Sequence, residues 1–343
     1  MRFKITTIFF CFILLVSCQT QRSLPLSDDG WNLCLYGVMV AGEPHHTVYV
    51  CRSYARKVES LTGEVAVSVS VNGTPVSVCY EKGISGVDQL SFQCELTEGD
   101  EIFLRVANAG RSAEARTMIP PACHLSAMDT SSVFNRGTTY LQVRDYHLVL
   151  HVNRSTDAYY LFRNADLEVS HYEGKTGTVY YEGTVPSSCR LDESSLPVDS
   201  TPFDLPDTFG GELGLPGKST VPHWVIIDGG NVDNPELKVT YSVQQYTGVR
   251  ENEYAASQYY QQWKMHSTVV LQVQTLSPET YWYYAALNTR QRVTDDIFSE
   301  PVVLVSNVSG GTGFLGAAHQ TVFRQPLADC LLREDYEVFV PGS

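Results

Sequence analysis

Residues 65–71 read Val-Ala-Val-Ser-Val-Ser-Val, and Asn72-Gly73 follows them directly. A valine at every second position is the period of a β-strand that buries one face. Asparagine and glycine both tolerate positive φ, which a two-residue hairpin turn requires. The stretch therefore predicts a strand that turns sharply into a second strand at residue 74.

Similar segments recur on both sides of this hairpin, from residue 31 to residue 120. Each is short and rich in valine or aromatic residues, and turn-forming residues separate it from the next. The expected strands are 33–40, 47–53, 65–71, 74–80, 89–95, 101–106 and 113–119. Seven strands in about ninety residues predict an immunoglobulin-like β-sandwich. Pro120-Pro121 ends it, because paired prolines can neither continue a ladder nor enter a helix interior.

Residues 121–343 are predicted to form a second, larger β-rich domain with one or two short helices, so the chain is expected to be mainly β. Ser277-Pro278-Glu279 is typical of a helix start and predicts a helix from Pro278 to about Arg290. A second helix is expected over residues 251–263. Residues 186–222 are rich in Pro, Gly, Ser and Asp, which predicts a long loop. The expected strands are 140–153, 158–163, 178–184, 225–227, 237–244, 268–275, 301–307 and 320–324.

The composition indicates an acidic protein with room for two cores. The chain has 343 residues, 24 Lys and Arg, 38 Asp and Glu, and a formal net charge of -14. A chain of this length is compatible with two domains. The negative balance argues against nucleic acid as a partner and disfavours lying flat on an anionic lipid surface.

The first 17 residues have the composition of an export signal. Arg2 and Lys4 precede an almost wholly apolar run, and small Ser17 stands directly before Cys18, as in the lipobox of bacterial lipoproteins. Cys18 is therefore expected to carry lipid and to begin the mature chain, with residues 18–30 as a tether. The alternatives are an ordinary secretory signal or a transmembrane helix, although the run is shorter than the roughly 20 apolar residues of a membrane span.

The sequence contains 9 cysteines, and seven remain when Cys11 in the leader and Cys18 are set aside. An exported protein can form disulfides, and an odd number leaves at least one thiol outside any internal bridge. Cys79 and Cys94 lie on expected neighbouring strands, which makes them the first candidate for a disulfide. The alternative is that several cysteines are small buried hydrophobic residues.

Aromatic residues are concentrated in two segments of the second domain. Trp263 lies in the first segment, and Tyr281, Trp282 and Tyr284 lie in the second. Such rings supply large contact area at low entropic cost, both on sugars and in protein interfaces. These four residues are therefore candidates for contact with a partner or a glycan. The alternative is that they pack the second core.

The sequence predicts no catalytic residue, no cofactor and no metal site. It contains no nucleophile elbow, zinc-protease helix or phosphate loop. Residues 311–316 have the glycine spacing of a dinucleotide fingerprint, but an extended segment and Pro326 follow instead of a helix, so a β-turn in a glycine-rich hairpin is expected. His45-His46 lacks a third ligand and is expected to lie in a solvated loop. Because carboxylate pairs for sugar hydrolysis are usually distant in sequence, an envelope hydrolase stays open as an alternative.

Several segments together resemble a known family. They are residues 35–40, Glu43-Pro44, residues 117–120, and above all residues 298–302, 306–308 and 313–316, which read Phe-Ser-Glu-Pro-Val, Ser-Asn-Val and Gly-Phe-Leu-Gly. This order resembles the Bacteroidetes-type surface lipoproteins of domain of unknown function 4249, over nearly the whole mature chain. The number of cysteines and the long loop at residues 186–222 depart from that pattern.

The resemblance implies an outer-membrane lipoprotein found with TonB-dependent transporter systems, and it transfers no catalytic residue. We therefore expect a non-catalytic lipoprotein that is anchored through Cys18, faces the cell exterior and acts as an accessory subunit of an outer-membrane β-barrel. A TonB-dependent transporter is the expected barrel, and other lipoproteins are further candidate partners. The competing function is a free-standing glycan-binding or adhesin module.

Overall fold

A computed structural model of the protein describes most of the chain after residue 29. The mainly β class predicted from the sequence is confirmed, and within the described ranges the only α-helix is α4 (Pro278–Val293). None of the helices in those ranges has the length and apolar character that a membrane crossing needs. The described residues are 30–54, 57–83, 86–135, 141–153, 155, 157–163, 165–173, 179–192, 201–203, 224–232, 236–248, 262–293, 304–327 and 330–333.

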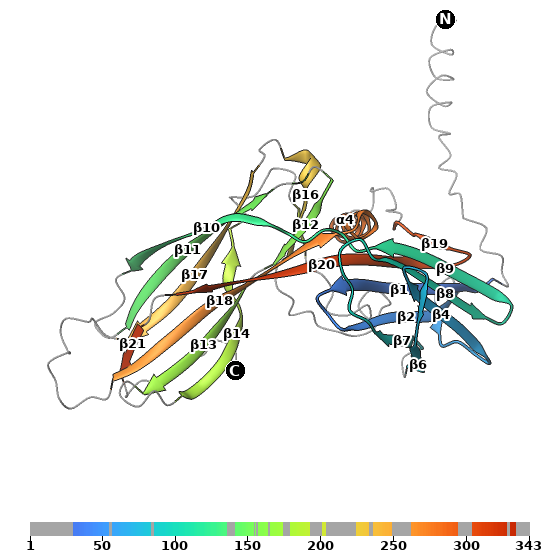
Figure 1. Ribbon diagram of the computed structural model, residues 1–343, viewed down its shortest axis with the longest axis horizontal. Helices are drawn as coiled ribbons and strands as arrows, with labels where there is room; N and C mark the ends of the chain where they lie inside the picture. Colours follow the sequence, from blue (N-terminus) through green and yellow to red (C-terminus); the bar gives the residue numbers. More distant parts are fainter. Residues whose placement is uncertain are drawn as a thin grey trace, which may run out of the picture.

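The first lobe is a β-sandwich with the strand order of an immunoglobulin domain (Figure 1). One sheet places β1, β2, β7 and β6 side by side, and the other places β9, β8, β4 and β5 side by side. With β1, β2, β4, β6, β7, β8 and β9 as strands A to G, these are the A-B-E-D and G-F-C sheets of an immunoglobulin fold, and β5 is an additional short strand beside β4. The predicted immunoglobulin-like β-sandwich is therefore confirmed. The bounds are β1 (Asn32–Ala41), β2 (His45–Tyr54), β3 (Lys57–Glu59), β4 (Val65–Val71), β5 (Thr74–Val76), β6 (Val78–Glu81), β7 (Asp88–Gln93), β8 (Glu101–Asn108) and β9 (Arg111–Met118).

The hairpin at Asn72-Gly73 forms as predicted. Val71 pairs with Thr74, and the two turn residues have φ of 50° and 77°. The expected strand at residues 74–80 is interrupted at Ser77, where the chain leaves the sheet of β5 and enters the opposite sheet as β6. Alternate side chains of both sheets then meet in one buried core, to which β4 contributes Val69.

The second lobe is built on the strand order β10-β11-β17-β14-β13-β18. Leu148, Leu150 and Val152 of β11 are fully buried, as their alternation predicts. They pack in one core with side chains of β17, β12, β16 and β18. The bounds are β10 (Leu125–Asn135), β11 (Leu141–Asn153), β12 (Tyr159–Arg163), β13 (Ala165–Glu173), β14 (Val179–Leu191), β15 (Thr201–Phe203), β16 (Trp224–Asp228), the 3-10 helix η2 (Gly229–Asn231), β17 (Glu236–Gly248), β18 (Gln262–Leu276) and β21 (Cys330–Arg333).

One strand, β20 (Thr312–Pro326), joins the two lobes, and Figure 1 shows it running from one to the other. Its first half pairs in parallel with β1, from Cys34 opposite Thr312 to Ala41 opposite His319. Its second half pairs antiparallel with β18. The result is a continuous 16-stranded sheet that passes through both lobes.

Close approach of β20 to β1 depends on Gly313. This glycine has φ of +112°, and a Cβ at this position would lie 2.1 Å from the carbonyl oxygen of Leu35. Only glycine adopts such a backbone conformation without strain and leaves this space free. The glycine-rich segment at residues 311–316 therefore lies where the lobes join. We call the pairing of residues 34–41 of β1 with residues 312–319 of β20 the seam. The expected hairpin does not form, because β19 (Val308–Ser309) pairs with β9 while β20 pairs with β1.

Two boundaries expected from the sequence are corrected. A single division at residue 120 is incomplete, because Val308, Leu315 and Ala317 return to the core of the sandwich. The expected loop at residues 186–222 begins later, since β14 runs to Leu191, and β15 interrupts it. Residues 193–200 and 204–223 of that loop, and residues 251–261 of the expected second helix, lie outside the described ranges.

Candidate interaction surface

Helix α4 is fixed at its start to the middle of β20. The hydroxyl of Ser277 accepts a hydrogen bond from the backbone N–H of Thr280 at 3.4 Å, as an N-cap does. The hydroxyl of Thr280 donates to the carbonyl of Ala317 at 3.0 Å and accepts from its N–H at 2.9 Å. The predicted helix start is confirmed, and the same residues hold α4 over the junction of the lobes (Figure 1).

One face of α4 is buried against the seam. Tyr283 is 2% exposed and stacks on Phe314 of β20, with ring centroids 4.3 Å apart and planes within 4°. Tyr36 of β1 meets Tyr283 edge-on at 6.3 Å. Gly316 leaves room for this packing, because a Cβ there would lie 2.2 Å from the Phe314 ring. These rings serve the fold.

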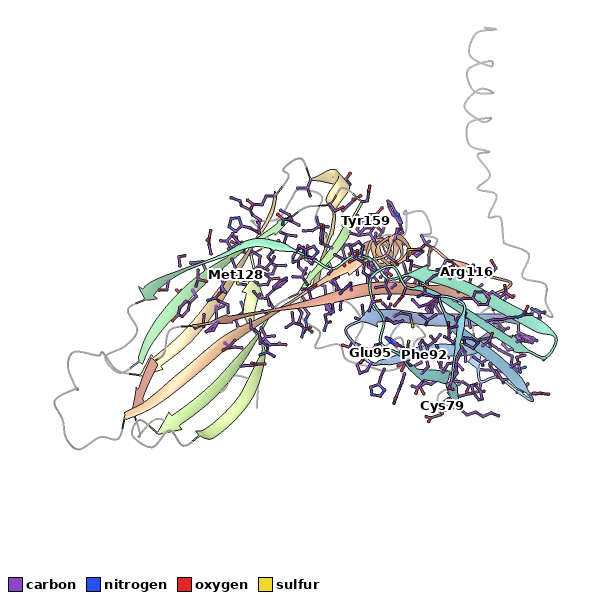
Figure 2. All side chains as sticks on the ribbon, in the orientation of Figure 1. Cys79, Phe92, Glu95, Arg116, Met128 and Tyr159 are labelled. Atoms are coloured by element: carbon purple, nitrogen blue, oxygen red, sulfur yellow. The ribbon has the colours of Figure 1, made fainter. Side chains whose placement is uncertain are left out.

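Two aromatic residues on the adjacent face of α4, Tyr281 and Trp282, lie against Tyr159 of β12, and we call these three residues the aromatic surface. Tyr281 stacks on Tyr159 with centroids 4.3 Å apart, and Trp282 meets both rings edge-on, at 5.2 Å from Tyr281 and 6.4 Å from Tyr159. Trp282 is 50% exposed. Figure 2 places Tyr159 beside α4. Among the described side chains, Trp282 is the only exposed Phe, Tyr or Trp.

The structure separates the four aromatic residues predicted for contact. Tyr281 and Trp282 lie together on the aromatic surface, although Tyr281 is half-buried and also packs against an apolar cluster. Tyr284 is half-buried as well and packs against two apolar clusters. Trp263 lies near the start of β18, where its backbone pairs with Glu173 and Leu332. Thirteen strand residues separate it from the start of α4, about 40 Å at 3.3 Å per residue. Trp263 is therefore not part of the same surface.

Tyr159 was missed in the sequence. It is the first residue of β12 and pairs with Leu276, the last residue of β18, which brings it beside α4. Its strand was predicted, but nothing in the local pattern indicates which other strand it joins. Sequence spacing alone therefore gives no signal for its contact with Tyr281.

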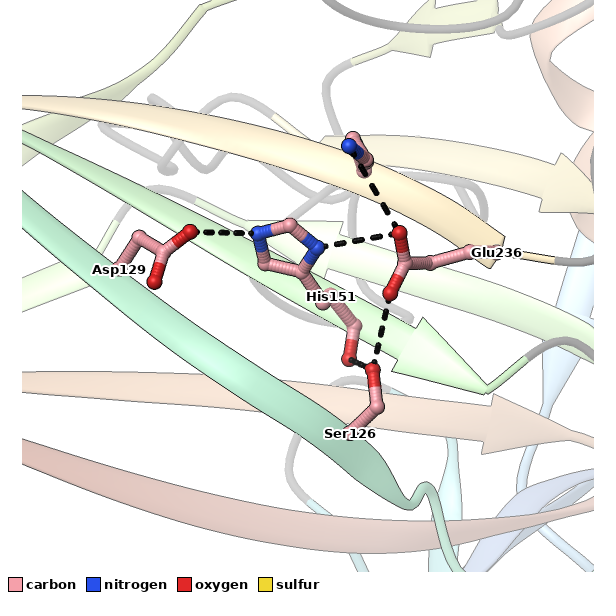
Figure 3. Close-up of polar contacts among 5 residues, drawn as sticks. Ser126, Asp129, His151 and Glu236 are labelled. Atoms are coloured by element: carbon pink, nitrogen blue, oxygen red, sulfur yellow. Dashed lines mark hydrogen bonds and ion pairs between the residues drawn. The ribbon is translucent and has the colours of Figure 1, made fainter.

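A polar cluster lies on β10, β11 and β17 (Figure 3). The ring of His151 lies between two carboxylates, with Nε2 at 3.0 Å from Asp129 and Nδ1 at 3.1 Å from Glu236. The hydroxyl of Ser126 donates to Glu236 at 3.0 Å, and Lys238 lies 3.7 Å from the same carboxylate. The hydrogen bond with His151 is the main cause that lowers the pKa of Glu236, and Ser126 adds to it.

This cluster does not have the geometry of a nucleophile with its base. Both ring nitrogens of His151 are engaged by carboxylates, and the hydroxyl of Ser126 contacts Glu236 and the carbonyl of His151 instead of the ring. The residues belong to three adjacent strands, so they join β10 and β17 to β11. Among the described residues, no group of three or more His, Cys, Asp or Glu side chains is placed to hold a metal ion.

The expected disulfide between Cys79 and Cys94 is not formed. Both are free thiols, and the register of β6 and β7 places Cys79 opposite Ser91, three residues before Cys94. Three strand residues are about 10 Å, which is beyond the reach of a disulfide. The alternative of small buried residues applies to Cys34, Cys51 and Cys123. Cys18, the expected lipid attachment site, lies outside the described residues.

The expectation for the two adjacent histidines is half wrong. His45 is exposed, but His46 is 2% exposed within β2, where its Nε2 lies 2.9 Å from the carbonyl of Cys94 and its ring packs on Phe92. Burial lowers the pKa of His46. The alternation of β2 turns His46 inward, so it belongs to the sandwich and not to a solvated loop.

The class of protein that these features define is a two-lobed β protein with an exposed aromatic surface beside α4. The family described as Domain of unknown function (DUF4249) matches residues 22–324, and the chain belongs to this family. The matched range includes both lobes and the seam. No curated protein matches the sequence significantly.

Solved structures resemble the chain only distantly. Bovine butyrophilin is 9% identical, with a TM-score of 0.18 and coverage of 70% of this chain and 91% of that one. A putative membrane anchored protein from Corynebacterium diphtheriae is 10% identical, with a TM-score of 0.18 and coverage of 70% and 54%. An I-band fragment of titin is 7% identical, with a TM-score of 0.19 and coverage of 85% and 96%. At these TM-scores the likenesses carry no conclusion about function.

Proposed function

We propose that the protein is a non-catalytic accessory subunit that docks on a partner protein through the aromatic surface. The observation that carries the proposal is Trp282, which is 50% exposed yet held edge-on against the stacked pair of Tyr159 and Tyr281. Tryptophan and tyrosine are enriched among the residues that contribute most to binding energy in protein interfaces. An exposed ring in a fixed orientation has little conformational entropy left to lose when it binds.

The aromatic surface lies beside a helix that is connected to both lobes, which supports its use as a docking surface. Helix α4 is bonded to β20 at Ala317, and β20 pairs with a strand of each lobe. A partner that binds α4 therefore binds an element that both lobes hold in place. Rigid elements position interface residues more accurately than loops do.

The partner we propose is an outer-membrane β-barrel protein, a TonB-dependent transporter, with other lipoproteins as further candidates. Support comes from the resemblance of the sequence to Bacteroidetes-type outer-membrane lipoproteins and from the expected lipid attachment at Cys18. In this proposal the protein is lipid-anchored in the outer membrane and faces the cell exterior. The net charge of -14 favours a body that the tether at residues 18–30 keeps away from anionic lipid.

The test is co-purification from outer membranes solubilised in mild detergent. The tagged protein is expected to bring down a barrel protein, and Trp282→Ala should reduce the recovered partner about tenfold or more, the loss typical of a central interface residue. Met118→Ala is the matched control, because Met118 is 56% exposed on the sandwich and lies outside the aromatic surface. Isolation of the wild-type protein alone, or equal recovery with Trp282→Ala, would contradict the proposal.

The anchor has its own test. Cys18→Ser should move the protein from the membrane fraction to the soluble fraction, and mass spectrometry of the wild-type protein should find an acylated Cys18 at the N-terminus. A native chain that begins elsewhere, with this thiol unmodified, would remove the proposed location but leave the docking surface standing.

A glycan-binding or adhesin module is the second candidate, and the stacked Tyr159–Tyr281 pair beside Trp282 favours it, because sugar rings also bind on aromatic faces. A glycan array with Trp282→Ala and Trp263→Ala separates the two functions. Sugar binding that Trp282→Ala abolishes, together with unchanged recovery of a barrel partner, would support the module. Absence of any array signal in the wild type would exclude it for the glycans on the array.

A further inference from the structure

Cys34 and Cys51 form a directly opposed pair of thiols. Cys34 lies in β1 and Cys51 in β2, and the two residues are cross-strand partners in the antiparallel register. They are 6% and 1% exposed. Their neighbours Leu33, Leu35 and Val50 belong to the sandwich core, so the two thiols point to the opposite, outer face of the sheet. There Val58 and Val87 cover them.

The backbone geometry fits a disulfide. Directly opposed residues in antiparallel strands have Cα atoms about 4.5–5.5 Å apart, within the range of about 4.4–6.8 Å that disulfides span. No other pair among the described cysteines is placed in this way. Cys79 is opposite Ser91, and Cys123 precedes β10, where its backbone N–H donates to Thr321.

The surroundings of the pair make one sulfur the better nucleophile. The hydrogen bond from Cys51 is the main cause that lowers the pKa of Cys34 to about 6, and Thr312 and Ser53 add to it against the effect of burial. The same hydrogen bond, together with burial, raises the pKa of Cys51. The hydroxyl of Thr312 lies 2.8 Å from the Cys34 sulfur. Cys34 is therefore suited to attack as a thiolate.

We propose that Cys34 and Cys51 form an intramolecular disulfide when the protein folds in an oxidising environment. The oxidant is a disulfide donor, either a small-molecule disulfide or a thiol–disulfide oxidoreductase. The Cys34 thiolate attacks one donor sulfur, and the other leaves as a thiolate. Cys51 then loses its proton and attacks the Cys34 sulfur of the mixed disulfide, which expels the second donor thiolate. Two protein thiols are oxidised, and one donor disulfide is reduced to two thiols, which take up the two protons.

The bridge would close the β1–β2 hairpin next to the seam. Thr312, the first residue of β20, contacts Cys34, so the bridge lies beneath the point where β20 joins β1. Because both thiols are buried in the folded protein, exchange with a donor has to occur before Val58 and Val87 pack over them. The hydrogen bond from Cys51 that favours the Cys34 thiolate lies within the β1–β2 pair, so it is already available at that stage. The bridge requires an oxidising environment but no docking partner, so it is independent of the proposed function.

The test is refolding of the full chain in a buffer of oxidised and reduced glutathione. After refolding, the protein is unfolded in guanidinium chloride, its remaining thiols are alkylated, and a non-reducing digest is analysed by mass spectrometry. A peptide that links Cys34 to Cys51 should be the dominant disulfide species, and it should disappear after reduction. Alkylation of both cysteines in most of the refolded wild-type protein would overturn the proposal.

Two variants sharpen the assignment. Cys34→Ser should make Cys51 fully alkylatable, whereas Cys79→Ser should leave the yield of the linked peptide unchanged. If Cys34→Ser fails to fold, the wild-type digest still decides the question. A dominant bridge from Cys34 or Cys51 to any other cysteine would contradict the proposed pairing.

Discussion

The sandwich and the strand β20 are held in place by contacts of very different range. In the sandwich, β8 turns into β9 and pairs from Asn108 opposite Arg111 onwards. The partner of β20 is β1, and the contact between Cys34 and Thr312 spans 278 residues of sequence. Contacts between such distant segments cost more chain entropy to form. The difference shows that hairpins within the sandwich can form by local pairing, whereas the union of the lobes depends on distant contacts at the seam.

The largest effect is expected from Phe314→Ala, which would break the seam. Phe314 is fully buried and stacks on Tyr283, so its truncation should lower the free energy of unfolding by about 4 kcal/mol. Because β20 joins both lobes, calorimetry should show one unfolding transition for the wild type and two for the variant. Leu104→Ala in the sandwich core is the control, with a loss of about 3 kcal/mol and no splitting of this kind. If the two variants show unfolding transitions of the same shape, the seam is no more important for the union of the lobes than the sandwich core is.

Gly313→Ala tests the seam at the backbone. The added Cβ would lie 2.1 Å from the Leu35 carbonyl at a φ of +112°, so a loss of about 3 kcal/mol is expected in chemical denaturation. Gly99→Ala is the matched control, because Gly99 has φ of +84° and nothing lies within 4 Å of the added atom. It should cost about 1 kcal/mol. Similar losses of stability in both variants would show that the close approach of β20 to β1 leaves room for a Cβ at residue 313.

Asp88→Ala tests the sandwich alone. The fully buried carboxylate accepts hydrogen bonds from the backbone N–H of Leu61 at 2.8 Å and from the hydroxyl of Tyr80 at 2.7 Å. Its removal leaves buried donors without an acceptor and should cost about 2 kcal/mol. Asp100→Ala, which removes comparable hydrogen bonds at an exposed turn, should cost about 1 kcal/mol, because water replaces them. A larger loss for Asp100→Ala would contradict this account.

The smallest effect concerns pH. Burial lowers the pKa of His46 in the folded state, so below the unfolded value of about 6.5 the unfolded chain binds more protons. Stability should therefore be full above pH 6.5 and fall below it, by at most about 1.4 kcal/mol per pH unit for this one group. His46→Gln should reduce the slope of unfolding free energy between pH 7 and 5, and His45→Gln should not. An unchanged slope in His46→Gln would assign the pH dependence to other groups.

Strands that bury one face could be predicted from the sequence, and strands in other environments could not. Residues 65–71 were predicted with their final bounds, because every second residue is valine. The same signal is absent from β20, where residues 313–318 are all buried and glycine and alanine replace the usual branched residues. A strand that is buried on both faces shows no alternation. Only its end, at residues 320–324, was predicted.

The candidate surface was predicted in part. The cap at Ser277 gave the start of α4, but Tyr281, Trp282, Tyr283 and Tyr284 are consecutive, and their spacing does not show which ring faces the seam. The edge strand β10 was missed because three serines, Asp129 and Asn135 interrupt its apolar residues, and Asp and Asn are depleted in strands. Tyr159 required the pairing of β12 with the end of β18, which depends on long-range packing.

The position of β1 has a mechanical consequence. This strand lies between β20, which runs parallel to it, and β2, which runs antiparallel, so it has hydrogen-bonded neighbours on both sides. A force that pulls the chain from residue 30 along the axis of β1 must slide this strand past both neighbours at once. Such a pull stresses many hydrogen bonds together in shear instead of opening them one after another. A body held by its N-terminal end would therefore resist extension at its first strand, which is also the strand that pairs with β20.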